Sequence, residues 1–152
     1  MKQADKEPFF VKGKQIEDAF ASLFTNTTEA TFNQNKYQHW DIQVGVKVEV
    51  KGMKKVRRND AEPDENIHWL ELIGNAGVYG WVYGDADYFA FETKRYFVIV
   101  QKHKLHEWIK QNITKEEVTQ PTLYKIYRPA DMRCKLTLVT TLDLCHISVS
   151  YT

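Results

Sequence analysis

The sequence predicts a mixed α/β (α+β) fold in which a mixed central β-sheet is flanked by helices. Two segments have the apolar spacing of amphipathic helices, several others alternate or are rich in β-branched residues, and turn-forming residues separate them. The expected order is a helix, a run of strands, a second helix and three further strands. There is no internal repeat and no break in composition, so residues 1–152 are expected to form a single domain.

Both helices are predicted from apolar stripes. The first follows Gly13, and its stripe consists of Ile16, Ala19, Phe20, Leu23 and Phe24. The second covers residues 102–111, with Leu105, Trp108 and Ile109 on its buried side. The polar residues 1–10 are expected to form a flexible N-terminal segment.

The strands are predicted from alternation and from the turns between them. A hairpin is expected from strands at about 37–43 and 46–51, with Gly45 at the turn. Further strands are expected at 67–73, 78–83, 87–92, 96–101, 123–127, 136–140 and 146–150. Residues 54–65 carry a basic run and then an acidic run without apolar periodicity, which is typical of a loop.

Composition narrows the class of protein. Hydrophobic residues make up 43% of the chain, but no apolar run approaches the roughly 20 residues of a membrane span. The polar start of the chain lacks the apolar core of a signal peptide, so a cytoplasmic protein without membrane contact is expected, with Cys134 and Cys145 as reduced thiols. The net charge is only +1, so any nucleic-acid binding must come from a local basic patch.

The most informative motif is a pair of carboxylates beside a lysine. Glu49 and Lys51 are two residues apart on a predicted strand and therefore project from the same face. Asp41 lies on the preceding strand and can approach Glu49 across the hairpin. Two carboxylates suit Mg²⁺, which is commonly held by one or two carboxylates, waters and a substrate phosphate. The competing interpretation is an ordinary strand edge on which opposite charges pair.

Two nearby features favour a site over a strand edge. Glu17 lies next to the apolar stripe of the first helix, from which it can reach the end of the sheet. The basic residues that follow the lysine are candidates for phosphate contacts, and they are Lys54, Lys55, Arg57 and Arg58.

These residues together resemble a known superfamily. Segments 13–17 (GKQIE), 40–41 (WD) and 48–52 (VEVKG) are similar to the motifs of the PD-(D/E)XK nucleases, which include restriction endonucleases and Holliday-junction resolvases. Segments 80–91 and 123–128 are similar to small phage and bacterial members. One departure is that Trp40 stands where many members have a proline.

The resemblance implies a restriction-endonuclease-like core, in which a helix is followed by a β-meander, a helix and a strand. It implies a metal-dependent DNA nuclease with Asp41 and Glu49 as metal ligands, Lys51 as a catalytic residue and Glu17 in support. The metal would be Mg²⁺, or Mn²⁺ in its place. The partner would be DNA, and a homodimer in which each protomer cuts one strand is a common arrangement.

Two other functions stay open at this point. The first is a non-catalytic nucleic-acid-binding module of the same fold. The second is a phage interaction or adaptor protein, with which the near-neutral charge and the aromatic content are compatible. The structure of the substrate also stays open, whether linear duplex, branched junction, single strand or RNA.

Several further residues have ordinary structural interpretations as well as functional ones. His103 and His106 could form half of a zinc site, but no third ligand is evident and solvated helix residues are the simpler interpretation. Asp85 and Asp87 are expected as turn residues, with a role as additional metal ligands as the alternative. Most tryptophans are expected in the core, and Trp81 between glycines is the best candidate for an exposed ring that stacks on bases.

Overall fold

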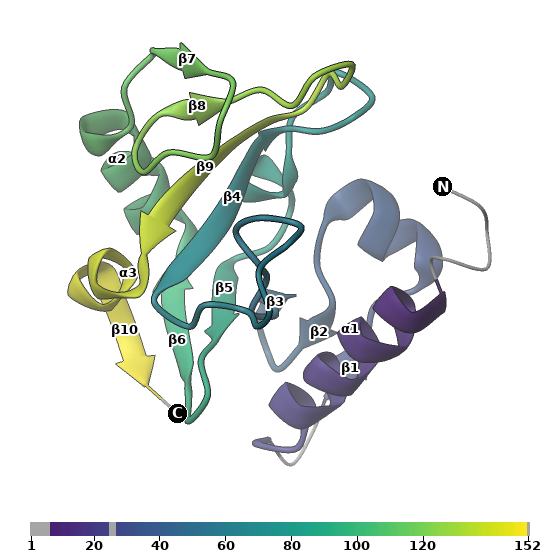
Figure 1. Cartoon of the computed structure of the whole chain (residues 1–152). Helices are drawn as coiled ribbons and strands as arrows, with labels where there is room; N and C mark the ends of the chain where they lie inside the picture. Colours follow the sequence, from purple (N-terminus) through teal and green to yellow (C-terminus); the bar gives the residue numbers. More distant parts are fainter. Residues whose placement is uncertain (1–6, 25–26, 152) are drawn as a thin grey trace.

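The computed structural model of the chain describes residues 7–24 and 27–151. Over these ranges the fold combines two mixed β-sheets with a few helices, so the predicted mixed α/β class is confirmed. Figure 1 shows α1 beside one end of the larger sheet and α2 and α3 beside the other. No helix in the described ranges is both long enough and apolar enough to span a membrane.

The larger sheet has six strands in the order β1-β2-β3-β5-β6-β10. The strands are β1 (Thr28–Glu29), β2 (Ile42–Gln43), β3 (Lys47–Lys51), β5 (Tyr88–Glu92), β6 (Phe97–Gln101) and β10 (Ser148–Tyr151). Strands β2 and β3 form an antiparallel hairpin, whereas β3 and β5 are parallel. The hairpin turn contains Gly45 with φ +87°, a left-handed conformation that glycine adopts without steric penalty.

The smaller sheet has four strands in the order β4-β9-β8-β7. The strands are β4 (Ile67–Ile73), β7 (Glu117–Val118), β8 (Ile126–Tyr127) and β9 (Lys135–Thr140). The long pairing is between β4 and β9, and β4 forms an edge of this sheet.

Five helical segments complete the described fold. They are α1 (Glu7–Ala21), the π-helical turn η2 (Gln34–Gln38), the 3₁₀ turn η3 (Trp81–Tyr83), α2 (Lys102–Asn112) and α3 (Thr141–Ile147). Helix α3 begins with a capping box in which the hydroxyl of Thr140 accepts a hydrogen bond from the backbone N–H of Asp143, and the Asp143 carboxylate accepts one from the Thr140 N–H.

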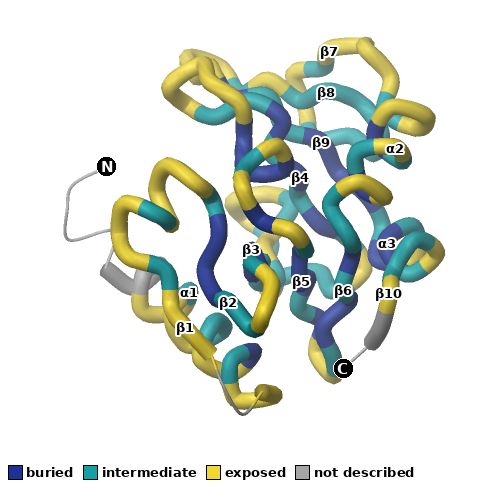
Figure 2. The backbone as a smooth tube through the Cα atoms, turned by 180° about the vertical axis from the view of Figure 1, so that it is seen from behind, coloured by how far each residue is buried: buried dark blue, intermediate teal, exposed yellow. Residues whose placement is uncertain are grey.

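The two faces of the larger sheet are buried against different elements. On one face Val48 and Val50 pack with Phe20 of α1. On the other, Phe89 and Phe91 belong to a larger apolar cluster. That cluster also contains Leu70 and Leu72 of β4, Trp81 of η3, Leu105 and Ile109 of α2, and Val139 of β9. Figure 2 shows the resulting band of buried backbone through β4, β5 and β6.

Most predicted elements are present with similar bounds. Strand 67–73 is found as predicted, and β3, β5, β6 and α2 agree to within a residue. Residues 52–66 contain neither helix nor strand, in agreement with the predicted loop. The core side of α2 is formed by Leu105 and Ile109, while Trp108 is half-buried.

Other predictions need correction. Gly13 lies inside α1 rather than before it. Residues 7–10 of the segment expected to be flexible belong to that helix, and residues 1–6 lie outside the described residues. Leu23 and Phe24 follow the helix and are exposed, so the apolar stripe ends earlier than predicted.

Four predicted strands are wrong or shorter than expected, namely 37–43, 78–83, 123–127 and 146–150. Residues 81–83 form η3, residues 34–38 form η2, and residues 141–147 form α3, so the last strand begins only at Ser148. In the segment predicted as strand 123–127, only Ile126 and Tyr127 are in a strand, and Leu123 makes an isolated bridge to Leu138. The physical reason is that short turns anchored by tertiary contacts leave no periodic signal in the sequence.

Candidate active site

The hairpin β2–β3 brings the predicted acidic residues together. Ile42 lies opposite Val48, and the backbone N–H of Asp41 donates to the carbonyl of Val48 at 2.8 Å. The next position along each chain is Asp41 on one side and Glu49 on the other. Lys51, two residues further along β3, projects from the same face as Glu49.

The carboxylate of Asp41 is buried and doubly hydrogen-bonded. Only 6% of the residue is exposed. One oxygen accepts from the backbone N–H of Val50 at 2.6 Å, and the other accepts from the side-chain amide of Asn35, which η2 positions. Burial and then the charge of Glu49 raise the pKa of Asp41 to about 7, although Lys51 and the two hydrogen bonds oppose the shift.

Glu49 and Lys51 form an ion pair on β3. One oxygen of Glu49 pairs with the Lys51 ammonium, which also lies over the Trp81 ring at 4.6 Å from its centroid. Burial alone would lower the pKa of Lys51, but the charges of Glu49 and Asp41 outweigh this effect and the pKa is raised. Lys51 is therefore a fixed positive charge beside two carboxylates.

The second oxygen of Glu49 is buried and has no hydrogen-bond partner among the described residues. A buried anionic oxygen without a donor is unfavourable by several kcal/mol in general, so natural proteins rarely keep one without a reason. An oxygen of this kind is able to act as a ligand for a cation.

Glu17 of α1 is electrostatically linked to this pair. Its side chain is half-buried. Burial and then the charge of Asp41 raise its pKa to about 7. Glu17 is therefore close enough to Asp41 for the charge of Asp41 to act on its carboxyl group.

These residues fit a hard divalent ion that uses few protein ligands. Within residues 7–24 and 27–151 there is no group of three or more His, Cys, Asp or Glu side chains arranged to hold a metal. A site for Mg²⁺ does not require one, because this ion keeps several waters and needs only one or two carboxylates. The unpartnered oxygen of Glu49 and the remaining lone pairs of Asp41 are suitable ligands.

The basic segment that follows β3 is exposed at Lys54, Lys55, Arg57 and Arg58. Lys54 also lines a cavity next to Lys51, and the pKa of its ammonium is lowered, first by desolvation and then by the charge of Lys51. In the described part of the chain none of these four side chains forms an ion pair, so the basic groups remain free for an anion.

Three residues near the site were not identified from the sequence. Asn35 donates to Asp41, while Glu71 of β4 adds a negative charge that acts on Lys51 and Lys54. His68 of β4 lines the same cavity. All three are far in sequence from the Glu49–Lys51 motif or lie in irregular structure, so only the tertiary arrangement shows them.

The remaining candidates have structural positions. Trp81, which was the best candidate for an exposed ring, is only 9% exposed and belongs to the core as expected of most tryptophans, and the Lys51 ammonium lies over its ring. Asp85 and Asp87 are exposed in the irregular segment before β5, and Asp87 accepts a long-range hydrogen bond from the backbone N–H of Lys47 at 2.8 Å. A ring nitrogen of His106 contacts the carbonyl of Val82, while His103 is exposed.

Comparisons with known proteins give no relative. No protein-family model matches the chain, and no curated protein or solved structure matches it. The functional argument therefore rests on the chemistry of the site.

Proposed function

We propose that this chain is a Mg²⁺-dependent nuclease that hydrolyses phosphodiester bonds in DNA, with Asp41, Glu49 and Lys51 as its central residues. The observation that supports this most directly is the buried, unpartnered oxygen of Glu49 beside a second buried carboxylate and a lysine. A purely structural ion pair would need neither the second carboxylate nor the open oxygen.

In this proposal each residue has a distinct role. Asp41 and Glu49 would hold the metal, which when bound supplies a water of lowered pKa and charge stabilisation at the phosphate. Lys51 stabilises the negative charge that develops on the phosphate oxygens as the water oxygen bonds to phosphorus and a P–O ester bond breaks. Glu17, with a pKa of about 7, would orient the attacking water and accept its proton near neutral pH.

The proposal includes a core of the restriction-endonuclease type. Helix α1, the hairpin β2–β3 and the later helix α2 occur in the expected order. There is one departure from a simple meander, because β4 joins the smaller sheet and β3 pairs in parallel with β5 instead. The departure concerns the strand that carries Glu49 and Lys51, whereas the hairpin that brings Asp41 beside Glu49 is antiparallel as expected.

The test is cleavage of supercoiled plasmid and labelled single strands with Mg²⁺ and with chelator. The parent protein should cut only with the metal. Lys51→Met should lower the rate at least about a hundredfold, since removing one group that stabilises the transition state commonly has effects of this size. Lys47→Ala, on the same strand, is the matched control and should cut at the parent rate.

A folding control is needed because removing one member of a buried ion pair leaves the other charge uncompensated. The double variant Glu49→Gln/Lys51→Met removes both charges, and it should fold and remain inactive. If Lys51→Met cuts as fast as the parent, the catalytic assignment is wrong. If the parent binds nucleic acid but never cuts it with Mg²⁺ or Mn²⁺, the chain is a binding module.

A further inference from the structure

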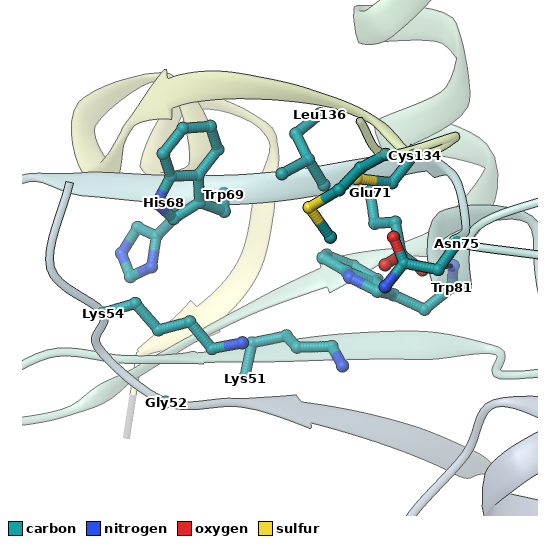
Figure 3. Close-up of a pocket in the computed structure, with 11 residues that line it drawn as sticks. Lys51, Gly52, Lys54, His68, Trp69, Glu71, Asn75, Trp81, Cys134 and Leu136 are labelled. Atoms are coloured by element: carbon teal, nitrogen blue, oxygen red, sulfur yellow. Dashed lines mark hydrogen bonds between the residues drawn. The ribbon is translucent and has the colours of Figure 1, made fainter. Parts of the chain in front are cut away.

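A cavity of about 300 Å³ lies between the strand that carries Lys51 and the edge strand β4. Figure 3 shows Lys51 and Lys54 on one side of it, with His68 and Trp69 of β4 and Trp81 of η3 around it. This volume is at the lower end of the range of small-molecule sites, roughly 300–1,000 Å³, and therefore suits one small ligand group.

One polar atom in the cavity wall lacks a partner. His68 is only 4% exposed, and its Nε2 atom is buried without a hydrogen-bond partner among the described residues. Burial lowers the pKa of His68 to about 4, so the imidazole is neutral at physiological pH. In Figure 3 the ring points from β4 toward Lys54. A neutral imidazole nitrogen in this position can donate one hydrogen bond to the polar edge of a ligand, or accept one from it, depending on the tautomer.

The remaining wall is mostly aromatic and aliphatic. Trp69 and Trp81 contribute rings, and Leu136 of β9, which lies opposite Glu71 in the register of the smaller sheet, contributes an aliphatic surface. The carboxylate of Glu71 and the amide of Asn75 add further hydrogen-bonding groups. A mostly apolar wall with a few polar groups suits a flat heteroaromatic ring.

The two lysines join this cavity to the carboxylates. Lys51 lines the cavity and is also paired with Glu49. A phosphate held at Lys51 would therefore lie between the carboxylate pair and the cavity. Lys54 lines the same cavity and offers a second positive charge to a bound nucleic-acid strand.

We propose that the cavity binds the base of one unpaired nucleotide next to the phosphodiester held at Lys51, so that the substrate is a single-stranded or unpaired segment rather than a continuous duplex. This inference rests on the proposed function, because it assigns the substrate of the same site. A base within an intact duplex is stacked and paired, and it would have to leave the stack before it could enter a cavity of this kind.

The test is equilibrium binding of a labelled strand of about a dozen nucleotides, which is within the usual range of single-strand site sizes. Binding is measured by fluorescence anisotropy in chelator, so that no cleavage occurs. The single strand is compared with a blunt duplex of the same sequence and with an abasic strand of the same length. The parent should bind the single strand about tenfold more tightly than either competitor, since base stacking and one hydrogen bond contribute at least this factor.

A matched pair of variants locates the preference in the cavity. Leu136→Phe adds volume to the cavity wall, whereas Leu142→Phe makes the same change on the exposed surface of α3, where 65% of the residue is accessible. The first should remove the preference for the single strand, and the second should leave it unchanged. Melting temperatures of both variants show whether they fold.

If Leu136→Phe does not fold, His68→Phe replaces it, because this change removes the unpartnered nitrogen and keeps a ring of similar shape. It should weaken single-strand binding about three- to tenfold and leave duplex binding unchanged. Equal binding of the duplex and single strand by the parent, or a preference that survives the folded cavity variant, would overturn the inference.

The result is separable from the nuclease proposal. Metal-dependent cutting without a single-strand preference would reject the cavity assignment alone. A single-strand preference located in the cavity without any cutting would reject the nuclease activity and keep the binding site.

Discussion

Asp41 is the residue at which the electrostatics of the site are concentrated. Its carboxylate is buried, accepts two hydrogen bonds and lies near the charges of Glu49 and Lys51. Because burial and Glu49 outweigh the favourable contacts, the ionised form is destabilised in the native protein. The destabilised ionised form indicates that Asp41 serves binding rather than stability.

The raised pKa of Asp41 predicts the direction of a pH effect. An unfolded aspartate has a pKa of about 3.9, whereas the native pKa is about 7, so the native state binds more protons between about pH 4 and pH 7. The contribution of Asp41 to stability is therefore largest below pH 4 and is lost as the pH rises through 7. The loss is on the order of 4 kcal/mol, at 1.36 kcal/mol for each of about three pKa units.

The measurement compares the melting temperatures of the parent and Asp41→Asn in chelator from pH 5 to pH 8. Asparagine can accept from the Val50 N–H, and the amide of Asn35 can rotate to accept from asparagine, so both contacts can persist. The melting temperature of the variant, relative to that of the parent, should rise as the pH increases. The contribution of His68 to stability changes with pH in the opposite direction. Its pKa is lowered in the native state, so the native protein loses stability as the pH falls below about 6.5. This contribution is common to both proteins. A constant difference would show that Asp41 has no raised pKa.

At the scale of elements, the site depends on close approaches between irregular segments and strands. The backbone of Gly80 lies so near Glu71 of β4 that a Cβ atom there would overlap the Glu71 carbonyl. Gly80 directly precedes η3, and its N–H donates to the carbonyl of Leu72 at 3.0 Å. Trp81 is therefore held against Lys51 by a contact that only glycine permits.

Two glycine substitutions should have opposite effects. Gly80→Ala should destabilise the protein by about 1–3 kcal/mol, because the backbone of η3 must move away from β4, and it should also lower activity through the shift of Trp81. Gly13→Ala lies within α1, where an added Cβ meets no atom, and should stabilise by about 0.5–1 kcal/mol. Denaturant unfolding of both variants checks this. Equal effects of the two changes would contradict the proposed packing of η3.

The extent to which the sequence predicts this structure differs between kinds of element. Strands with alternation, such as β3 and β4, were predicted because each side chain's face follows from a period of two. The shared face of Glu49 and Lys51 follows from the same rule. The short turns η2 and η3 were not predicted, because Asn35 and Trp81 make their contacts outside their own turns, with Asp41 and Lys51. Helix α3 had a signal in Thr140 and Asp143, but its capping box precedes a helix of only seven residues.

At the scale of the whole molecule, the charge is nearly balanced, with a net value of +1. Long-range attraction to a polyanion is therefore weak, and binding depends on local groups. The exposed basic residues after β3 are such groups, since they form no ion pairs within the described ranges.

The salt dependence of binding measures their contribution. The double variant Lys55→Ala/Arg57→Ala should reduce the slope of log affinity against log salt by roughly 1.4 on single strands or 1.8 on duplex, because each lost phosphate contact removes about 0.7 or 0.9. The control Lys104→Ala/Lys110→Ala removes two exposed charges from α2 and should leave the slope unchanged. An identical slope for all three proteins would mean that the basic segment does not contact phosphate.

Metal binding should be visible in the stability of the whole molecule without any substrate. An ion that binds only the native state stabilises it by about 2.7 kcal/mol at a hundredfold excess over its dissociation constant. For a chain of 152 residues this corresponds to a rise in melting temperature of roughly 5–10 °C. Mg²⁺, or Ca²⁺ as a non-catalytic substitute, should produce this rise in the parent, and Asp41→Asn should lose most of it.

The control for this experiment is Asp85→Asn, which removes a carboxylate from an exposed position and should keep the full response to metal. The response should also increase from pH 6 to pH 8, since the ion requires the ionised form of Asp41. A purely structural pairing of Glu49 and Lys51 gives the opposite pattern, with little response to divalent ions and no stabilisation in Asp41→Asn. A parent that melts at the same temperature in chelator and in ten-millimolar Mg²⁺ at pH 8 would therefore remove the metal from the proposed mechanism and leave the nucleic-acid-binding module as the better account of this site.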